Sequence, residues 1–350
     1  MSTNRAIAIP EGVYLGAHMS IAGGFDQAAE RARQVGATAL QVFVKSASQW
    51  RARPLEPDEG EKFQAACRAA GVQRVVAHDS YLINLCSGDP VLWNRSVGAL
   101  VHEMERCDQL GIPGLVTHPG AHGGDGEEAG VERLVRAIDM LEEKLPEARV
   151  KVWLETTAGQ GTGVGYRFEH LGEVLRRARS PARVGICLDT CHVFAAGYDL
   201  RTPEEYERTI REFDRVIGLE NLAAIHLNDS KKDLGSRVDR HEHIGQGCIG
   251  LEAFRCLMQD TRLRGLPMVL ETPKADDLHE DVENLGRLCA LLDAPAGSVK
   301  GPTAGARPGV PASAAKQPKK SVERADAAAP AAGPAPKRRR PASPRGSARR

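Results

Sequence analysis

Nine residues of the types that bind metal ions lie mostly where short apolar runs end. They are His78, His118, Glu155, Asp189, His192, His226, Asp239, His241 and Glu271. The runs VVAHD, GLVTH, KVWLE, VGICLD, AAIH and MVLE carry six of them. An imidazole or carboxylate beside a buried strand is costly unless it is hydrogen-bonded, paired with an opposite charge or bound to a cation. The recurrence therefore predicts one site that binds several metal ions.

The number and type of these side chains indicate which ions they suit. A catalytic zinc ion usually keeps about three protein ligands, so nine candidates suit three ions if one carboxylate bridges two of them. Asp189 and His192 are three residues apart, and Asp239 and His241 are two apart, so each pair can face one way. Histidine and carboxylate ligands without cysteine favour zinc, with manganese or iron as alternatives. We interpret Cys191 as a small packing residue.

Apolar segments alternate with amphipathic segments over residues 1–295. The predicted strands cover residues 13–18, 39–44, 74–78, 114–118, 150–155, 184–189, 222–227 and 267–271. The predicted helices cover residues 24–36, 57–71, 89–111, 127–145, 167–179, 202–218 and 249–260. Eight almost continuously hydrophobic strands predict an α/β fold, a (β/α)8 TIM barrel, with its active site at the carboxyl ends of the strands.

The composition fits a large core and no membrane segment. The 350 residues, 41% of them hydrophobic, suffice for two average domains or for one α/β barrel, which needs about 250 residues. We find neither an apolar run of about 18 residues nor a secretory signal, so we expect an intracellular protein without membrane partners. The eight cysteines contain no CxxC pair, which indicates reduced thiols.

Charge is divided unevenly along the chain. Residues 301–350 hold 12 Lys and Arg against Glu323 and Asp326, a net charge of +10, whereas the remainder carries 35 basic and 44 acidic residues, a net charge of −9. We therefore predict a barrel domain at 1–295 and a disordered basic tail at 296–350, rich in Ala, Pro, Arg and Lys. We interpret the tail as a tether to nucleic acid phosphates, with a solubilising extension as the alternative.

Seven motifs resemble those of the endonuclease IV family of metal-dependent apurinic/apyrimidinic endonucleases. They are GAHMSIAGG at 16–24, HDSYLINL at 78–85, HPG at 118–120, ETTAGQG at 155–161, LDTCHVFAAGYDLRT at 188–202, HLNDSKKDLGSRVDRHEHIGQGCIG at 226–250 and LET at 270–272. They occur in family order, and the resemblance covers about residues 13–292, which leaves the tail unaccounted for.

The resemblance implies three zinc ions, with manganese as an alternative at one position. The implied ligands are His78, His118 and Glu155 for the first ion, Glu155, Asp189, His226 and Glu271 for the second, and His192, Asp239 and His241 for the third. The implied substrate is double-stranded DNA with abasic sites or blocked 3′ ends. The implied reaction is hydrolysis of the phosphodiester 5′ to an abasic site, which leaves a 3′-hydroxyl and a 5′-deoxyribose phosphate. Removal of 3′ blocking groups would accompany it in base excision repair.

The chemistry of such a site suits this reaction. Zinc lowers the pKa of a bound water to about 7, and a metal cluster neutralises the attacking and leaving oxygens of a phosphoryl displacement. Glu155 and Glu271 are the candidate catalytic residues because they would position the nucleophile. Arg240 is predicted to contact a phosphate, with a surface ion pair as the alternative. Tyr81 and Leu82 resemble the family's wedge, which fills the gap left by an extruded nucleotide; core packing is the alternative.

The segment VKSASQWR departs from the family pattern. Ser46 and Ser48 stand where the family commonly has an amide and an arginine, which argues against an arginine wedge from this segment. Gln49, Trp50 or Arg51 would then compensate, and we take Gln49 as the candidate DNA-binding residue.

A sugar isomerase or epimerase on a similar barrel is the alternative function. Such an enzyme uses one divalent ion held by two Glu, one Asp and one His, which Glu155, Asp189, His226 and Glu271 would satisfy. The five other candidate ligands would then be superfluous. A non-catalytic DNA-binding protein would leave all nine unexplained. We expect a monomeric enzyme that acts at the nucleoid in a bacterial cytoplasm.

Overall fold

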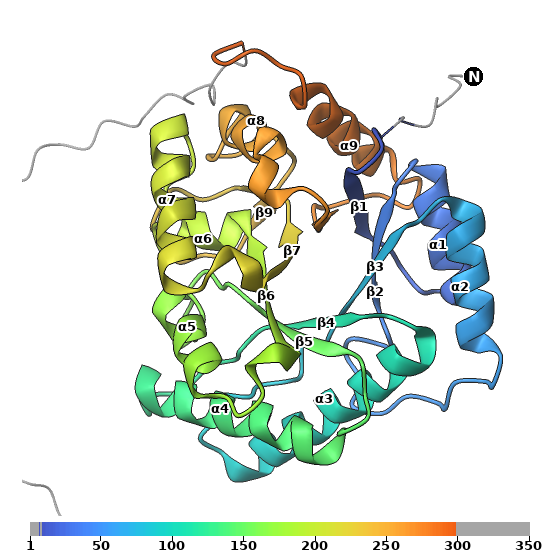
Figure 1. The fold of residues 1–350 in the computed structure, drawn as a ribbon, viewed down its shortest axis with the longest axis vertical. Coiled ribbons are helices and arrows are strands. Elements are labelled where there is room, and N and C mark those ends of the chain that lie inside the picture. Colours follow the sequence, from blue (N-terminus) through green and yellow to red (C-terminus); the bar gives the residue numbers. More distant parts are fainter. Residues whose placement is uncertain (1–6, 8, 299–350) are drawn as a thin grey trace, which may run out of the picture. The chain divides into compact units, whose positions relative to one another are not determined.

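The computed structural model describes residues 7 and 9–298, and these form a closed parallel barrel (Figure 1). Its strands are β1 (Tyr14–His18), β2 (Ala39–Phe43), β3 (Arg74–His78), β4 (Gly114–Thr117), β5 (Lys151–Glu155), β6 (Val184–Asp189), β7 (Leu222–His226) and β10 (Pro267–Leu270). Their order around the barrel is β1, β10, β7, β6, β5, β4, β3, β2, so each strand pairs with its sequence neighbours among them. The predicted TIM barrel is confirmed. From residue 299 on, the predicted tail lies outside the described residues.

Helices surround the strands on the outside of the ring (Figure 1). They are α1 (Phe25–Gln34), α2 (Glu59–Ala70), α3 (Pro90–Leu110), α4 (Glu127–Lys144), α5 (Phe168–Arg177), α6 (Thr190–Ala196), α7 (Pro203–Val216), α8 (Leu251–Gln259) and α9 (His279–Leu291). Short 3-10 helices cover Pro181–Arg183, Leu219–Asn221 and Thr261–Leu263. The hairpin β8 (Asp229–Ser230) and β9 (His241–Glu242), like α6, was not predicted. Within the described ranges, no helix has the length and apolarity to cross a membrane.

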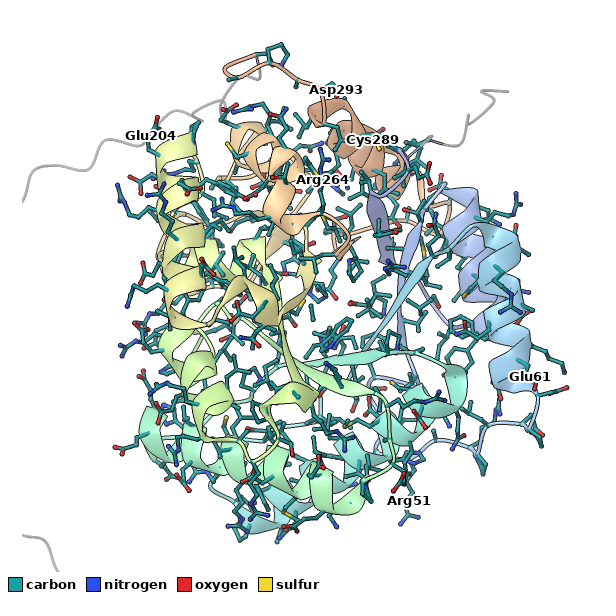
Figure 2. The ribbon with its side chains drawn as sticks, viewed as in Figure 1. Arg51, Glu61, Glu204, Arg264, Cys289 and Asp293 are labelled. Carbon is teal, nitrogen blue, oxygen red and sulfur yellow. The ribbon has the colours of Figure 1, made fainter. Side chains whose placement is uncertain are left out.

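Local sequence signals set the ends of several helices. The Asp89 side chain accepts hydrogen bonds from the Val91 and Leu92 amides, and Pro90 occupies the first position of α3. Gly111 ends α3 in the left-handed conformation, with φ of 69°. An acidic cap, an initial proline and a terminal glycine are common boundary signals. Charged side chains such as Glu61 of α2 and Glu204 of α7 project from the outer side of the ring (Figure 2).

A separate apolar cluster lies inside the barrel, two residues before the strand-end ligand candidates. It consists of Val76, Val116, Trp153, Cys187 and Ala224. Side chains alternate between the two faces of a strand, so residues two apart point the same way. This apolar layer therefore underlies the layer of polar side chains at the carboxyl ends of the strands.

Trp153 fits into this layer because its neighbouring strands carry glycines. A Cβ atom at Gly114 of β4 would lie 2.1 Å from the Trp153 ring, and one at Gly185 of β6 would lie 2.7 Å from it. Both distances are far shorter than van der Waals contact. The two glycines thus make room for the indole directly below Glu155.

We expect Gly114→Ala to destabilise the barrel by about 1–3 kcal/mol, because it overpacks the interior against Trp153. Thermal and denaturant unfolding of the variant would measure the loss. Gly98→Ala is the matched control: a Cβ there meets nothing within 4 Å, and alanine favours the helix. Equal stability of Gly114→Ala and the wild type would contradict the packing argument.

Candidate metal centre

The six strand-end candidates lie at one end of the barrel. His78, Glu155, Asp189 and His226 are the last residues of their strands, whereas His118 and Glu271 directly follow β4 and β10. All of these strands run parallel in one closed sheet, so their carboxyl ends form a single rim.

The first group joins His78 and His118 to Glu155. The Nε2 atoms of His78 and His118 lie 3.1 and 2.9 Å from Oε2 of Glu155. The Glu155 side chain is fully buried, whereas that of His118 is 42% exposed. One atom from each residue can be chosen so that all three lie within 4.8 Å of one another. These are the ligands expected for the first ion.

The second group surrounds the other oxygen of Glu155. Nδ1 of His226 lies 2.8 Å from Oε1 of Glu155, 3.3 Å from Oε2 of Glu271 and 3.8 Å from Oδ2 of Asp189. The four residues again offer atoms within 4.8 Å of one another. Glu155 therefore faces the first group with one oxygen and the second group with the other, which is the arrangement that a bridging carboxylate requires.

The third group comes from elements outside the regular barrel. His192 lies in α6, Asp239 lies between β8 and β9, and His241 begins β9. The Nε2 atoms of His192 and His241 lie 3.2 and 3.3 Å from the two oxygens of Asp239. The structure thus brings together all nine predicted residues, in the three groups expected from the sequence motifs.

Backbone carbonyls orient three of the imidazoles. Nδ1 of His78 lies 3.0 Å from the Asp79 carbonyl, Nδ1 of His192 lies 2.8 Å from that of Thr156, and Nδ1 of His241 lies 3.2 Å from that of Glu271. An Nδ1–H that donates to a carbonyl leaves Nε2 unprotonated and able to bind a metal ion.

Sequence reasoning missed Gln41, which orients three side chains. Its Oε1 lies 2.8 Å from Nε2 of His226, and its Nε2 donates to Glu271 and to His18 at 2.6 and 3.0 Å. His226 can therefore donate from Nε2 and turn Nδ1 toward the carboxylates. His18, at the end of β1, is held beside the group by its contact with Gln41. A buried amide inside the apolar strand ALQVF was the available signal.

Asn228 was missed as well. Its side-chain nitrogen donates to Oδ2 of Asp189 at 2.7 Å, and its side-chain oxygen accepts from the Glu271 backbone at 2.8 Å. This amide therefore fixes two members of the second group. Such partners of metal ligands set ligand orientation.

The concentration of carboxylates demands positive charge. Burial raises the pKa of Glu155, but the charges of His226 and His118 outweigh burial and hold the pKa well below its ordinary value. Burial lowers the pKa of His78, but its hydrogen bond to Glu155 and the charge of that carboxylate raise the pKa to about 9. Four acids and five histidines packed together need either protons or cations to compensate them. Nitrogen and oxygen donors of this kind fit zinc.

Cys191 lies close to Asp189 and His241 but behaves as a packing residue. Its side chain is fully buried, and burial raises the pKa of its thiol to about 12. Only the thiolate is a good zinc ligand, so this geometry agrees with the interpretation from the sequence.

Two cavities open from the centre. We name each cavity after a residue that lines it but not the other. The Glu271 cavity has a volume of about 520 Å³, and the Trp50 cavity has a volume of about 750 Å³. Both are lined by His118, Asp239 and Arg240, among others.

The predicted DNA-binding residues differ in their relation to these cavities. Tyr81 lines both cavities and is 77% exposed, so the core-packing alternative is wrong for it. Leu82 lines the Trp50 cavity, and Arg240 lines both. Gln49 lines neither of them; it borders a smaller pocket of about 270 Å³ next to Lys45.

Comparison with known proteins gives concordant matches. Residues 29–292 match the family described as a xylose isomerase-like TIM barrel. The chain is 52% identical to "Probable endonuclease 4" of Chloroflexus aurantiacus over 277 residues, which are 79% of this chain and 97% of the relative. The crystal structure of endonuclease IV from Thermus thermophilus aligns with a TM-score of 0.70 and 39% identity, covering 80% of this chain and 99% of that one.

A D-tagatose 3-epimerase-like protein also aligns, with a TM-score of 0.60 over 80% of this chain and 98% of that one. Its 16% identity shows a shared fold and no more. The endonuclease matches cover a similar share of the chain at much higher sequence identity, 52% and 39%. The chain belongs to the endonuclease IV family of nucleases.

Proposed function

We propose that this protein is a DNA-repair endonuclease that uses three zinc ions to hydrolyse the phosphodiester 5′ to an abasic site. The products are a 3′-hydroxyl and a 5′-deoxyribose phosphate, and the same centre removes blocking groups from 3′ ends. The enzyme acts as a monomer on double-stranded DNA in the bacterial cytoplasm, at the nucleoid. Family membership supports the nuclease activity.

The observation that carries the proposal is the position of Glu155 between two groups of ligand-type side chains. Its two oxygens face different histidines at 2.8 to 3.1 Å. We assign His78, His118 and Glu155 to one ion, Glu155 with Asp189, His226 and Glu271 to a second, and His192, Asp239 and His241 to a third. Manganese is the alternative at one of these positions.

The ions would supply an activated water and compensate the charge of the phosphate. The protein's own residues position the water, the phosphate and the DNA. Glu271 is 19% exposed, borders the Glu271 cavity and is held by Gln41, so it can orient the nucleophilic water. Arg240 borders both cavities and can contact a phosphate. Tyr81 and Leu82 fill the gap left by an extruded nucleotide.

The epimerase alternative uses only the second group. It leaves the first-group histidines and the whole third group without a role, although their side chains converge to within 4.8 Å. A phosphodiesterase needs this larger set because it compensates a nucleotide's charge as well as activating water.

Replacing Glu271 by Gln should reduce nicking of an abasic duplex by about 100-fold or more, because the amide keeps the shape but not the charge that a cation requires. A chelator should abolish nicking by the wild type. Single-turnover assays on a duplex with one abasic site measure both effects, and Glu61→Gln, on the outside of α2, is the matched control. Isomerised sugar together with intact DNA would instead support the epimerase.

Metal content tests the ligand assignment without an activity assay. We expect three transition-metal ions per chain in the wild type and about two in Asp239→Asn, because the third group loses its only carboxylate. Elemental analysis of purified protein measures the ratio, with Glu61→Gln as the control. Fewer than two ions in the wild type would contradict the assignment.

Truncation after Pro295 tests the predicted tether. We expect kcat at low salt to stay nearly unchanged and DNA binding to weaken. The slope of the logarithm of the binding constant against the logarithm of salt concentration should become shallower by about 0.9 for each phosphate that the shortened chain no longer neutralises. A tail of equal length with Gln in place of Lys and Arg separates charge from length. An unchanged slope in both variants would remove the tether.

A further inference from the structure

The Trp50 cavity is bordered both by residues of the metal centre and by aromatic and aliphatic side chains. Its lining includes His118, Asp239 and Arg240 together with Trp50 and Leu92. Charged and cation-binding groups suit the phosphate of a nucleotide, and an indole in the same cavity suits its base.

Trp50 lies on the loop that connects β2 to α2. It is half-buried and packs on the hydrophobic core, and the Arg95 guanidinium of α3 lies 4.2 Å from the centre of its ring. Arg95 thus covers one face of the indole, and the Trp50 side chain also borders the cavity. This contact holds the ring in place.

A buried ion pair fixes the backbone of this loop. Lys45 and Glu103 of α3 lie 2.9 Å apart with both side chains 1% exposed, and Nζ of Lys45 also donates to the Gln49 carbonyl at 2.6 Å. Arg106 of α3 donates to the carbonyls of Val44 and Arg53 at 2.7 and 2.8 Å. The loop that presents Trp50 is therefore tied to α3 on both sides of the indole, at Val44 and Lys45 and at Arg53.

The same carboxylate holds a second segment of the cavity lining. Glu103 accepts hydrogen bonds from the Ser80 amide at 3.1 Å and from its hydroxyl at 2.8 Å. Ser80 directly precedes Tyr81 and Leu82, which also line the cavity. Both segments are thus positioned before any ligand binds, which lowers the ordering cost of binding.

The other side chains of the loop do not reach the cavity. Ser46 and Ser48 are exposed and lie 3.3 Å from each other, and Gln49 borders a different pocket. The exposed Arg51 projects to the outside of the ring of elements (Figure 2). Of residues 46–51, Trp50 alone lines the Trp50 cavity.

We propose that Trp50 stacks on a nucleobase left without a partner next to the cleaved phosphodiester. The inference rests on the proposed function, because it assigns one contact of the same substrate. An abasic site leaves the opposite base unpaired and the flanking bases unstacked on one side, so either source presents a free aromatic face. Stacking on an indole accepts any base, which suits an enzyme that meets lesions in every sequence.

The first test compares Trp50→Leu with Trp50→Phe in steady-state cleavage of an abasic duplex. We expect Trp50→Leu to raise KM about tenfold with kcat within about twofold, because stacking is lost in ground and transition states alike. Trp50→Phe keeps an aromatic face and should stay close to the wild type. Val91→Ala, a 75% exposed side chain of α3 that does not line the cavity, is the matched control. An unchanged KM for Trp50→Leu would overturn the proposal.

The second test identifies the base. It compares abasic duplexes that each lack one further base. In one duplex a baseless spacer replaces the nucleotide opposite the abasic site, and in the others it replaces one flanking nucleotide. In the arm that lacks the stacked base, wild-type KM should rise about tenfold and Trp50→Leu should cause no further rise. If Trp50→Leu raises KM equally in every arm, the indole packs within the loop and the stacking proposal fails.

Fluorescence provides a readout that does not depend on cleavage. Trp93 and Trp153 are only 3% and 8% exposed, so Trp50 is the most accessible of the three tryptophans. Adding the nicked product duplex should quench the emission of the wild type but not that of Trp50→Leu. Quenching of equal size in both proteins would contradict stacking. Absence of wild-type nicking would instead count against the proposed function, which keeps the two failures distinguishable.

Discussion

The buried carboxylate of Glu155 is the constraint on which the centre depends. It has no solvent exposure, and it lies within 3.1 Å of imidazole nitrogens on both of its oxygens. An uncompensated carboxylate in this position would cost several kcal/mol. Cationic partners must therefore stay beside it, and this requirement holds His78, His118 and His226, from the ends of three different strands, around one side chain.

The barrel meets this requirement through packing as much as through polar contacts. Trp153 fills the interior below Glu155, and the glycines of the two flanking strands leave room for it. The third group needs a different support. Asp229, at the start of the β8–β9 hairpin, accepts backbone hydrogen bonds from Gly245, Gly247 and Ile249 at 2.9 to 3.0 Å. This buried carboxylate ties the chain on both sides of the segment that carries Asp239 and His241.

A second buried carboxylate, Glu103, organises the lining of the Trp50 cavity in a similar way. Glu103 is a buried carboxylate that organises two loops, as Glu155 organises two ligand groups. In both places the cost of burying charge is offset by multiple hydrogen bonds, and the result is a fixed geometry. The positioned parts of the enzyme thus extend from the metal centre to the cavity lining.

The sequence by itself determined the eight strands, most of the outer helices and the positions of the strand-end ligands, because side-chain periodicity and strand ends are local properties. The grouping of the ligands rested on motif resemblance. The tertiary structure decided which histidines each oxygen of Glu155 faces. It also decided the roles of Gln41 and Asn228, since even the lone amide of an apolar strand does not show which side chains it meets. Glu103 lies in an amphipathic helix and reads as a surface residue, yet its side chain is 1% exposed. Such contacts join residues dozens to hundreds of positions apart, and no local pattern encodes which distant partner a polar side chain meets.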